Sequence, residues 1–117
     1  MAVLILKLDT PVEAFGRPVT EITLKEPTGG LYSRLGEPRI GVYNEKTGSG
    51  YFIEQRDVIR QYLDRLVEID GEATAASVVM AGLSLTDAKR LQDALFHFFD
   101  AAARKAAELR WTPSSLN

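Results

Sequence analysis

The sequence predicts an α+β fold, in which an N-terminal antiparallel β-hairpin packs on about three helices and the last helix is long. Two observations lead to this prediction. Within the first 25 residues, two short segments rich in aliphatic and β-branched side chains flank a segment with Gly and Pro. From residue 54 onward, apolar residues recur every three or four positions, which is the spacing of one helix face. With 117 residues, the chain is expected to form a single domain over residues 1–110 and a flexible tail over 111–117.

The two predicted strands of the hairpin are residues 3–8 and 19–25. The first is short and aliphatic, and we expect the Asp-Thr-Pro step at residues 9–11 to end it because proline cannot donate to a ladder. The second alternates apolar and polar side chains, and residues 13–18 predict a long turn. Because two strands alone are marginally stable in water, the hairpin must pack on a helix or find a third strand. Its apolar face is expected to use Leu4, Leu6, Ile22 and Leu24.

The pattern leaves two alternatives open for residues 36–53. This segment is rich in Gly, Pro and Asn, and only residues 40–43 and 51–53 are typical of strands. Either a second small hairpin or an ordered loop is expected there. Just before it, residues 31–35 favour one helical turn.

Residues 54–69 predict a helix whose apolar residues share one face. Asp70 and Gly71 are expected to end this helix, since glycine commonly follows a helix C-terminus. Residues 72–81 predict a short further helix that ends at Gly82. The helical residues expected to face the hairpin are Val58, Tyr62, Leu66, Leu91 and Leu95.

The last helix is predicted over residues 84–110, where Ser84 and Asp87 have the spacing of an N-terminal capping box. The opposite side of this helix, Asp87 included, carries charges of both signs. At about 1.5 Å per residue the helix is roughly 40 Å long, which is more than a domain of this size needs to cover its core. Part of its apolar face is therefore predicted to contact a partner. That face consists of Leu85, Ala88, Leu91, Leu95, Phe98, Ala102, Ala106 and Leu109.

Three phenylalanines lie near the middle of this helix. Successive residues of a helix point about 100° apart, so we expect Phe98 in the core face and at least one of Phe96 and Phe99 near the surface. With the residues that follow the helix, these rings suggest an exposed apolar strip of the kind that binds partners. The predicted partner-binding residues are Leu91, Leu95, Phe96, Phe99, Leu109 and Trp111.

The composition argues against several classes of function. The formal net charge is −2 and the Lys and Arg residues are scattered, so no nucleic-acid partner is expected. No apolar run approaches the roughly 18 residues of a membrane span, and the opening residues lack the basic leader of a signal peptide. We therefore expect neither a membrane partner nor export. The absence of cysteine excludes disulfides and thiolate metal sites and agrees with a reducing cytoplasm.

No catalytic, cofactor-binding or metal-binding residues are predicted. His97 is the only histidine and has no evident orienting partner, so a helix-surface position is favoured over an acid–base role. Asp64, Glu68, Asp70 and Glu72 are close in sequence but lack the pattern of a calcium loop, which favours a solvated helix end. A small enzyme is the least favoured alternative, because it would need a pocket that gathers at least two acids with perturbed pKa values.

Residues 4–34 resemble the start of the tail assembly chaperones of Mu-like contractile-tailed phages and their prophages. In that family a short strand ends in an Asp/Thr-Pro step, and a glycine-containing loop leads to a second strand of the form e-i-t-L-r-e-P. A later helix begins with l-t-d-a and reaches a Phe-Phe pair. The chain differs from this pattern in its longer segment at residues 37–52 and in about three further helical turns after the pair. The matching residues are Pro11, Gly16, Glu21, Ile22, Thr23, Leu24, Glu26, Pro27, Gly29, Leu85, Thr86, Asp87, Ala88, Leu91, Phe98 and Phe99.

The resemblance implies a non-enzymatic protein of the bacterial host cytoplasm. Such a chaperone would bind the phage tape measure protein, keep it soluble during tail assembly and be displaced by tail tube subunits. The tape measure protein is then the expected partner, the tail tube protein a further candidate, and a homo-oligomer one arrangement of the chain. The alternative is a structural component of a phage tail or head–tail junction, in which a free hairpin edge pairs with a neighbouring sheet. That alternative predicts incorporation into finished particles, where a chaperone should be absent.

Overall fold

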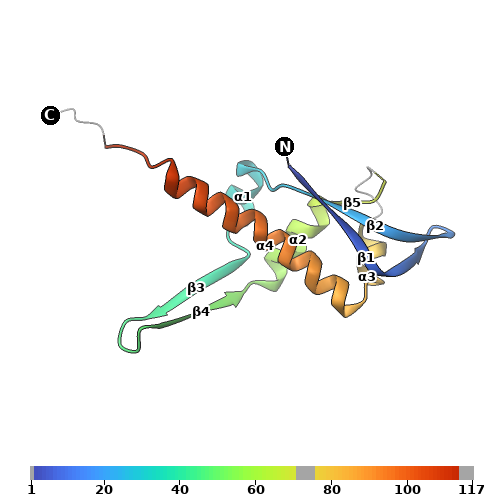
Figure 1. Cartoon of the computed structure of the whole chain (residues 1–117), viewed down its shortest axis with the longest axis horizontal. Helices are drawn as coiled ribbons and strands as arrows, with labels where there is room; N and C mark the ends of the chain where they lie inside the picture. Colours follow the sequence, from blue (N-terminus) through green and yellow to red (C-terminus); the bar gives the residue numbers. More distant parts are fainter. Residues whose placement is uncertain (1, 71–75, 114–117) are drawn as a thin grey trace.

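The computed structural model describes residues 2–70 and 76–113 of the chain. These residues form an α+β fold with two antiparallel sheets and a long last helix, as the sequence predicts (Figure 1). The elements, in chain order, are β1 (Val3–Ala14), β2 (Arg17–Lys25), α1 (Gly29–Leu35), β3 (Arg39–Asn44), β4 (Ser49–Glu54), α2 (Arg56–Leu66), β5 (Val67–Glu68), α3 (Ala76–Ala81) and α4 (Leu85–Glu108).

The predicted N-terminal hairpin is present, but its first strand is longer than expected. β1 continues through Asp9, Thr10 and Pro11, with an irregular register between Lys7 and Val12. The Asp87 carboxylate of α4 accepts hydrogen bonds from the backbone N–H groups of Asp9 (3.0 Å) and Thr10 (3.1 Å) in this irregular stretch. β1 therefore continues past Pro11, because the buried Asp87 carboxylate supplies the hydrogen-bond acceptors that the strand ladder lacks there.

The turn of the hairpin is shorter than the long loop that the sequence suggests. Ala14 pairs with Arg17, so only Phe15 and Gly16 connect the strands. Both have positive φ, 56° and 74°, as the central residues of a type I′ turn do. This turn matches the twist of the two strands, so they pair as far as Ala14 and Arg17. The Gly and Pro content of the segment does not predict so short a connection.

The predicted helix over residues 54–69 is wrong at its C-terminal end. α2 ends at Leu66, and Val67 takes the extended conformation with φ −82° and ψ 131°. β5 pairs antiparallel with β2, so the hairpin has found its third strand. Val67 and Ile69 are both buried, as alternate residues of an extended segment are when one face meets the core. Over so few residues, the spacing of apolar side chains is compatible with both a helix and a strand. Pairing with β2 decides for the strand.

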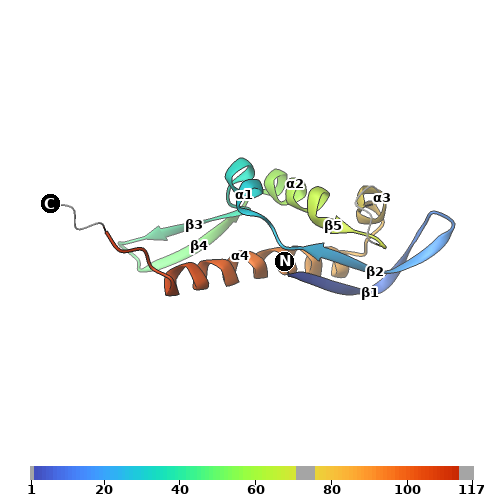
Figure 2. The ribbon, with the colours of Figure 1, turned by 90° about the horizontal axis from the view of Figure 1, so that it is seen from above.

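α4 covers the sheet together with α2 and then continues beyond both (Figure 2). At its first turn the face toward the core is not the predicted one. Leu85 and Ala88 are exposed, whereas Asp87 has no exposed surface. The capping box is half formed, because Ser84 accepts from the Asp87 N–H at 3.1 Å while the Asp87 carboxylate bonds to β1 instead. The core comprises Val12, Ala14, Val19, Ile22, Leu24, Ile59, Tyr62, Leu66, Val67, Ile69, Val79, Leu91, Leu95, Phe96 and Phe98.

Residues 36–53 adopt the hairpin, not the loop. β3 and β4 pair in regular register from Arg39 opposite Glu54 to Asn44 opposite Ser49, and they project away from the core (Figure 1). The predicted helical turn before them is α1, and α3 provides the short helix expected near residues 72–81. Gly71, Glu72 and the end of the predicted tail, residues 114–117, lie outside the described residues. The radius of gyration is 17.4 Å, against about 13 Å for a compact domain of this length, because the β3–β4 hairpin and the end of α4 extend as two arms.

Candidate partner-binding surface

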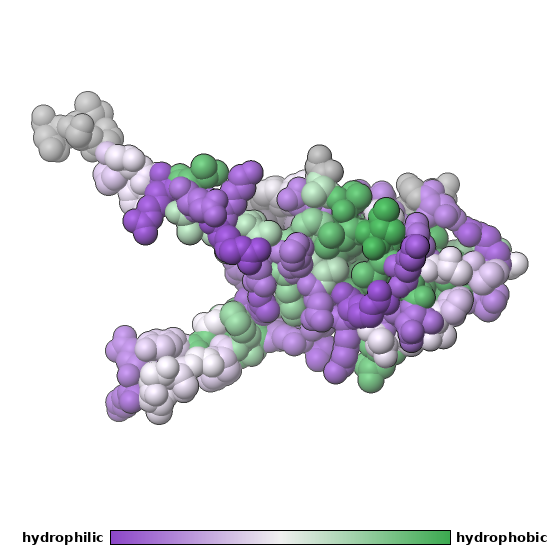
Figure 3. Space-filling view, viewed as in Figure 1, coloured by the Kyte–Doolittle hydropathy of each residue, from purple (hydrophilic) through white to green (hydrophobic). Residues whose placement is uncertain are grey.

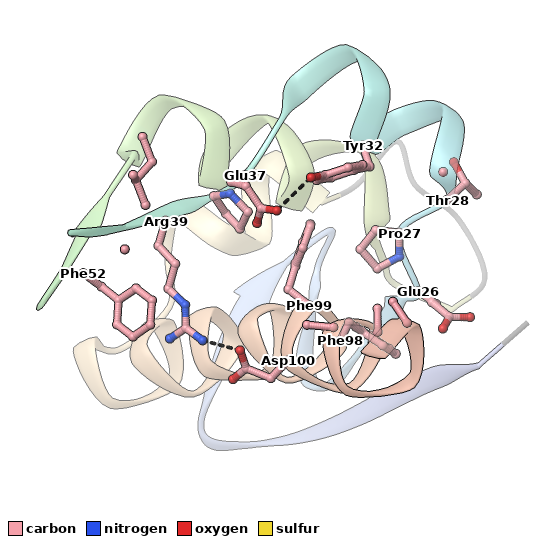
Figure 4. A pocket seen from close by; sticks show the side chains of 17 residues that line it. Glu26, Pro27, Thr28, Tyr32, Glu37, Arg39, Phe52, Phe98, Phe99 and Asp100 are labelled. Carbon is pink, nitrogen blue, oxygen red and sulfur yellow. Dashed lines mark hydrogen bonds and ion pairs between the residues drawn. The ribbon is translucent and has the colours of Figure 1, made fainter. Parts of the chain in front are cut away.

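A notch of about 660 Å³ lies between the two arms. Figure 3 shows it as the hollow between the end of α4 and the β3–β4 hairpin. α1 and the segments beside it close the notch at its inner end (Figure 4). Its lining is Glu26, Pro27, Thr28, Gly29, Tyr32, Glu37, Pro38, Arg39, Ile40, Gly41, Phe52, Phe98, Phe99, Asp100, Ala102, Ala103 and Ala106.

The floor of the notch is aromatic and is anchored to the core. The Phe99 ring meets the buried Tyr62 ring edge-on, with centroids 5.2 Å apart, and lies 6.1 Å from the Tyr32 ring. The Tyr62 hydroxyl donates to the Gly36 carbonyl at 2.6 Å and so fixes the end of α1. Burial, more than the nearby charge of Glu37, raises the pKa of Tyr62 to about 12. This hydroxyl therefore remains a donor at neutral pH. The floor is therefore preorganised before any partner arrives.

Arg39 joins the hairpin arm to α4. Its guanidinium carbon lies 4.4 Å from the ring centroid of Phe52 and 4.5 Å from that of Phe96, so the cation is held between two aromatic faces. It also forms an ion pair with Asp100 (Figure 4). The contact fixes the base of the hairpin to α4 and places Phe52 at the wall of the notch.

The notch carries an excess of negative charge. Glu26, Glu37 and Asp100 line it, and Arg39 is the one cationic residue among the described residues of its lining. In the described part of the chain neither Glu26 nor Glu37 forms a salt bridge. Glu37 instead accepts from the Tyr32 hydroxyl at 2.8 Å, and this hydrogen bond raises the pKa of Tyr32. A cationic group of a partner would meet an acidic rim around an apolar floor.

The β3–β4 hairpin exposes large apolar side chains on both faces. In the ladder, Ile40 pairs with Ile53 and Val42 with Tyr51 on one face, while Phe52 lies opposite Gly41 on the other. Tyr51 and Phe52 are each 62% exposed. Among the described residues no third strand joins this sheet. An isolated two-stranded hairpin is marginally stable in water, so its apolar faces and free edges are suited to a partner.

The structure divides the six predicted partner-binding residues into two groups. Leu91, Leu95 and Phe96 are buried in the core, because the first half of α4 lies on the sheet, and they form no exposed surface. Phe99 lies in the notch, and Leu109 and Trp111 are exposed beyond the helix end. Arg39, Phe52 and Ala103 also line the notch but do not stand out in the sequence. Ala102 and Ala106 belong to the apolar helix face of which part was predicted to contact a partner, because the helix is longer than the core requires.

Among the described residues, His97 and the acidic side chains considered as a catalytic or metal-binding set are exposed or form ion pairs. His97 is exposed, Glu68 pairs with Lys25 at 3.3 Å, and Asp70 pairs with Arg17. No group of three or more metal-ligating side chains occurs within residues 2–70 and 76–113, and Glu72 lies outside them. Backbone hydrogen bonding, first from Asp9, lowers the pKa of Asp87 to about 2 against the opposing effect of burial. Its partners are structural groups of β1 and α4.

Comparisons with protein-family models, curated proteins and solved structures find no match to this chain. Among the described helices, α4 included, none is sufficiently long and apolar to span a membrane.

Proposed function

We propose that this chain is a phage tail assembly chaperone that binds the tape measure protein and keeps it soluble until tail tube subunits displace it. The observation that carries the proposal is the apolar notch between the two arms, which no part of the described chain covers. The resemblance of residues 4–34 and of the start of α4 to the family supplies the identity of the client. The proposed protein is non-enzymatic and acts in the cytoplasm of the bacterial host.

The notch suits an amphipathic helix. Recognition of a helix in a groove needs an apolar floor for residues spaced three and four apart and walls on both sides. Here Phe99 and the alanines of α4 supply the floor, while Phe52 supplies a wall. An open surface of this kind favours modest affinity per copy, which allows later displacement. Several copies along one long helical client would protect it from aggregation.

Co-expression with the long helical protein encoded just downstream tests the proposal. Purification through an affinity tag, followed by mass determination, should recover a soluble complex with several copies of this chain per client. Phe52→Ser should weaken the complex at least about tenfold, because an aromatic wall residue is lost. Tyr51→Ser is the matched control, since Tyr51 is equally exposed but lies on the opposite face of the hairpin. No association, with the client equally soluble alone, would rule out the chaperone.

The β3–β4 hairpin favours one alternative, a structural component of a phage tail or head–tail junction. Both strands of this sheet have an unpaired edge within the described residues, and such edges can add to a neighbouring sheet. Mass spectrometry of purified phage particles distinguishes the two functions. Stoichiometric amounts of this chain in finished particles would support the structural component, and its absence would support the chaperone.

A further inference from the structure

The end of α4 is an arm that no other part of the described chain covers. Every residue from 102 to 111 is exposed, with Leu109 at 70% and Trp111 at 84%. Ala102 and Ala103 precede Ala106 by four and three residues, so all three lie on one side of the helix, and this side lines the notch. Side chains this small allow two helix axes to come close together.

The chain exposes more surface than a compact monomer of its mass. Its accessible surface is 8252 Å², whereas the scaling for folded monomers gives roughly 6,300 Å². The difference is larger than the roughly 800 Å² that each partner buries in a standard interface. The extended shape of the chain therefore leaves enough surface for a dimer interface of standard size.

The two arms are complementary in charge. The notch carries Glu26, Glu37 and Asp100 against one arginine, and neither glutamate has a salt-bridge partner among the described residues. Residues 104–110 carry two arginines and one lysine against one glutamate. An acidic apolar notch and a basic apolar helix end on the same molecule fit each other when two copies meet.

We propose that the notch binds the end of α4 from a second copy of this chain, reciprocally, in a two-fold dimer. The two helix ends run antiparallel, with Ala103 of one copy opposite Ala106 of the other. Arg110 of each copy then lies beside Phe99 and Asp100 of its partner, within the acidic rim. In a parallel pair the two basic ends would lie side by side and repel each other. The two-fold arrangement is closed, because the notch of each copy is occupied by the helix end of the other and no binding surface remains for a third copy.

This dimer does not depend on the proposed function. It covers the alanine face, Leu109 and Trp111 in the free protein, where an exposed apolar surface of this kind would promote aggregation. If a helical client also binds the notch, client and second copy exclude each other. Dimerisation would then set the concentration at which the chaperone becomes available.

Sedimentation equilibrium of the purified full chain over a range of concentrations tests the dimer. The wild type should follow a monomer–dimer equilibrium. Ala106→Glu should raise the dissociation constant of the dimer at least about tenfold, since each copy places one carboxylate in the apolar contact between the two α4 helices. Ala107→Glu is the matched control, because Ala107 is exposed and does not line the notch. A wild type that stays monomeric, or an equal effect of both substitutions, would overturn the proposal. A monomer would leave the notch to a partner of different sequence.

A second pair of variants tests the antiparallel arrangement. Arg110→Glu should weaken the dimer by several-fold at low salt and less at high salt, because it places a carboxylate against the acidic rim. Arg104→Glu makes the same charge change on a residue that does not line the notch and should have a smaller effect. An equal effect of the two variants would overturn this placement of the helix end.

Discussion

Leu95→Ala tests whether the first half of α4 carries the core. Leu95 has no exposed surface and belongs to the cluster formed by the sheet, α2 and α4. The substitution removes three carbon atoms, worth about 2.4 kcal/mol at roughly 0.8 kcal/mol per buried methylene. The cavity that remains adds to this loss at about 24 cal/mol per Å³, so we expect the free energy of unfolding to fall by roughly 3–4 kcal/mol.

Urea denaturation followed by far-UV circular dichroism is the suitable assay, because the one tryptophan, Trp111, lies exposed beyond α4 and would report poorly on the core. The slope of the transition should stay unchanged, so that the loss appears as a lower midpoint. Leu85→Ala is the control, since Leu85 is 74% exposed on the first turn of α4 and lies outside both arms, and it should change the stability by less than about 0.5 kcal/mol. A Leu95→Ala loss no larger than that of the control would refute the placement of α4 on the sheet.

Three further predictions concern the connections between elements. The pKa of Asp87, lowered to about 2 from 3.8, means that its contribution to stability is complete above pH 4 and disappears as the pH falls toward 2. Urea midpoints between pH 5 and pH 2 should therefore fall more steeply for the wild type than for Asp87→Asn, and parallel curves would contradict this role. Phe15→Asn should stabilise the chain by roughly 0.5–1 kcal/mol, because Phe15 has φ 56° and asparagine tolerates that conformation; a loss in the same urea assay would show that the exposed ring matters more than the backbone. Arg39→Ala should speed hydrogen exchange in β3 and β4 while β1 and β2 remain protected, since Arg39 holds the hairpin to α4. Unchanged exchange in β3 and β4 would mean that other contacts fix the arm.

The sequence by itself determined the fold class and part of the core. Alternation in residues 19–25 and helical spacing from residue 54 place Ile22, Leu24, Tyr62, Leu66 and Leu95 on faces that must be buried, and the structure buries all five. These predictions succeed because the periodicity that gathers apolar residues on one face depends only on neighbours along the chain. The excess length of the last helix likewise follows from the sequence, since helix length is proportional to residue number.

Only the tertiary structure decided where each element ends and which apolar residues remain exposed. β1 continues past Pro11 because Asp87, which lies far along the chain, accepts hydrogen bonds from the backbone of β1. α2 ends at Leu66 because the next residues pair with the free edge of β2 as β5. The notch likewise depends on residues distant in sequence, since Arg39 pairs with Asp100 of α4 and lies over the ring of Phe52, which forms the wall. Leu95 and Leu109 belong to the same predicted helix face, yet one is buried and the other exposed, because the sheet and α2 extend only along the first half of α4. Local spacing defines a face, but the length of the surface that covers it is set by the rest of the fold.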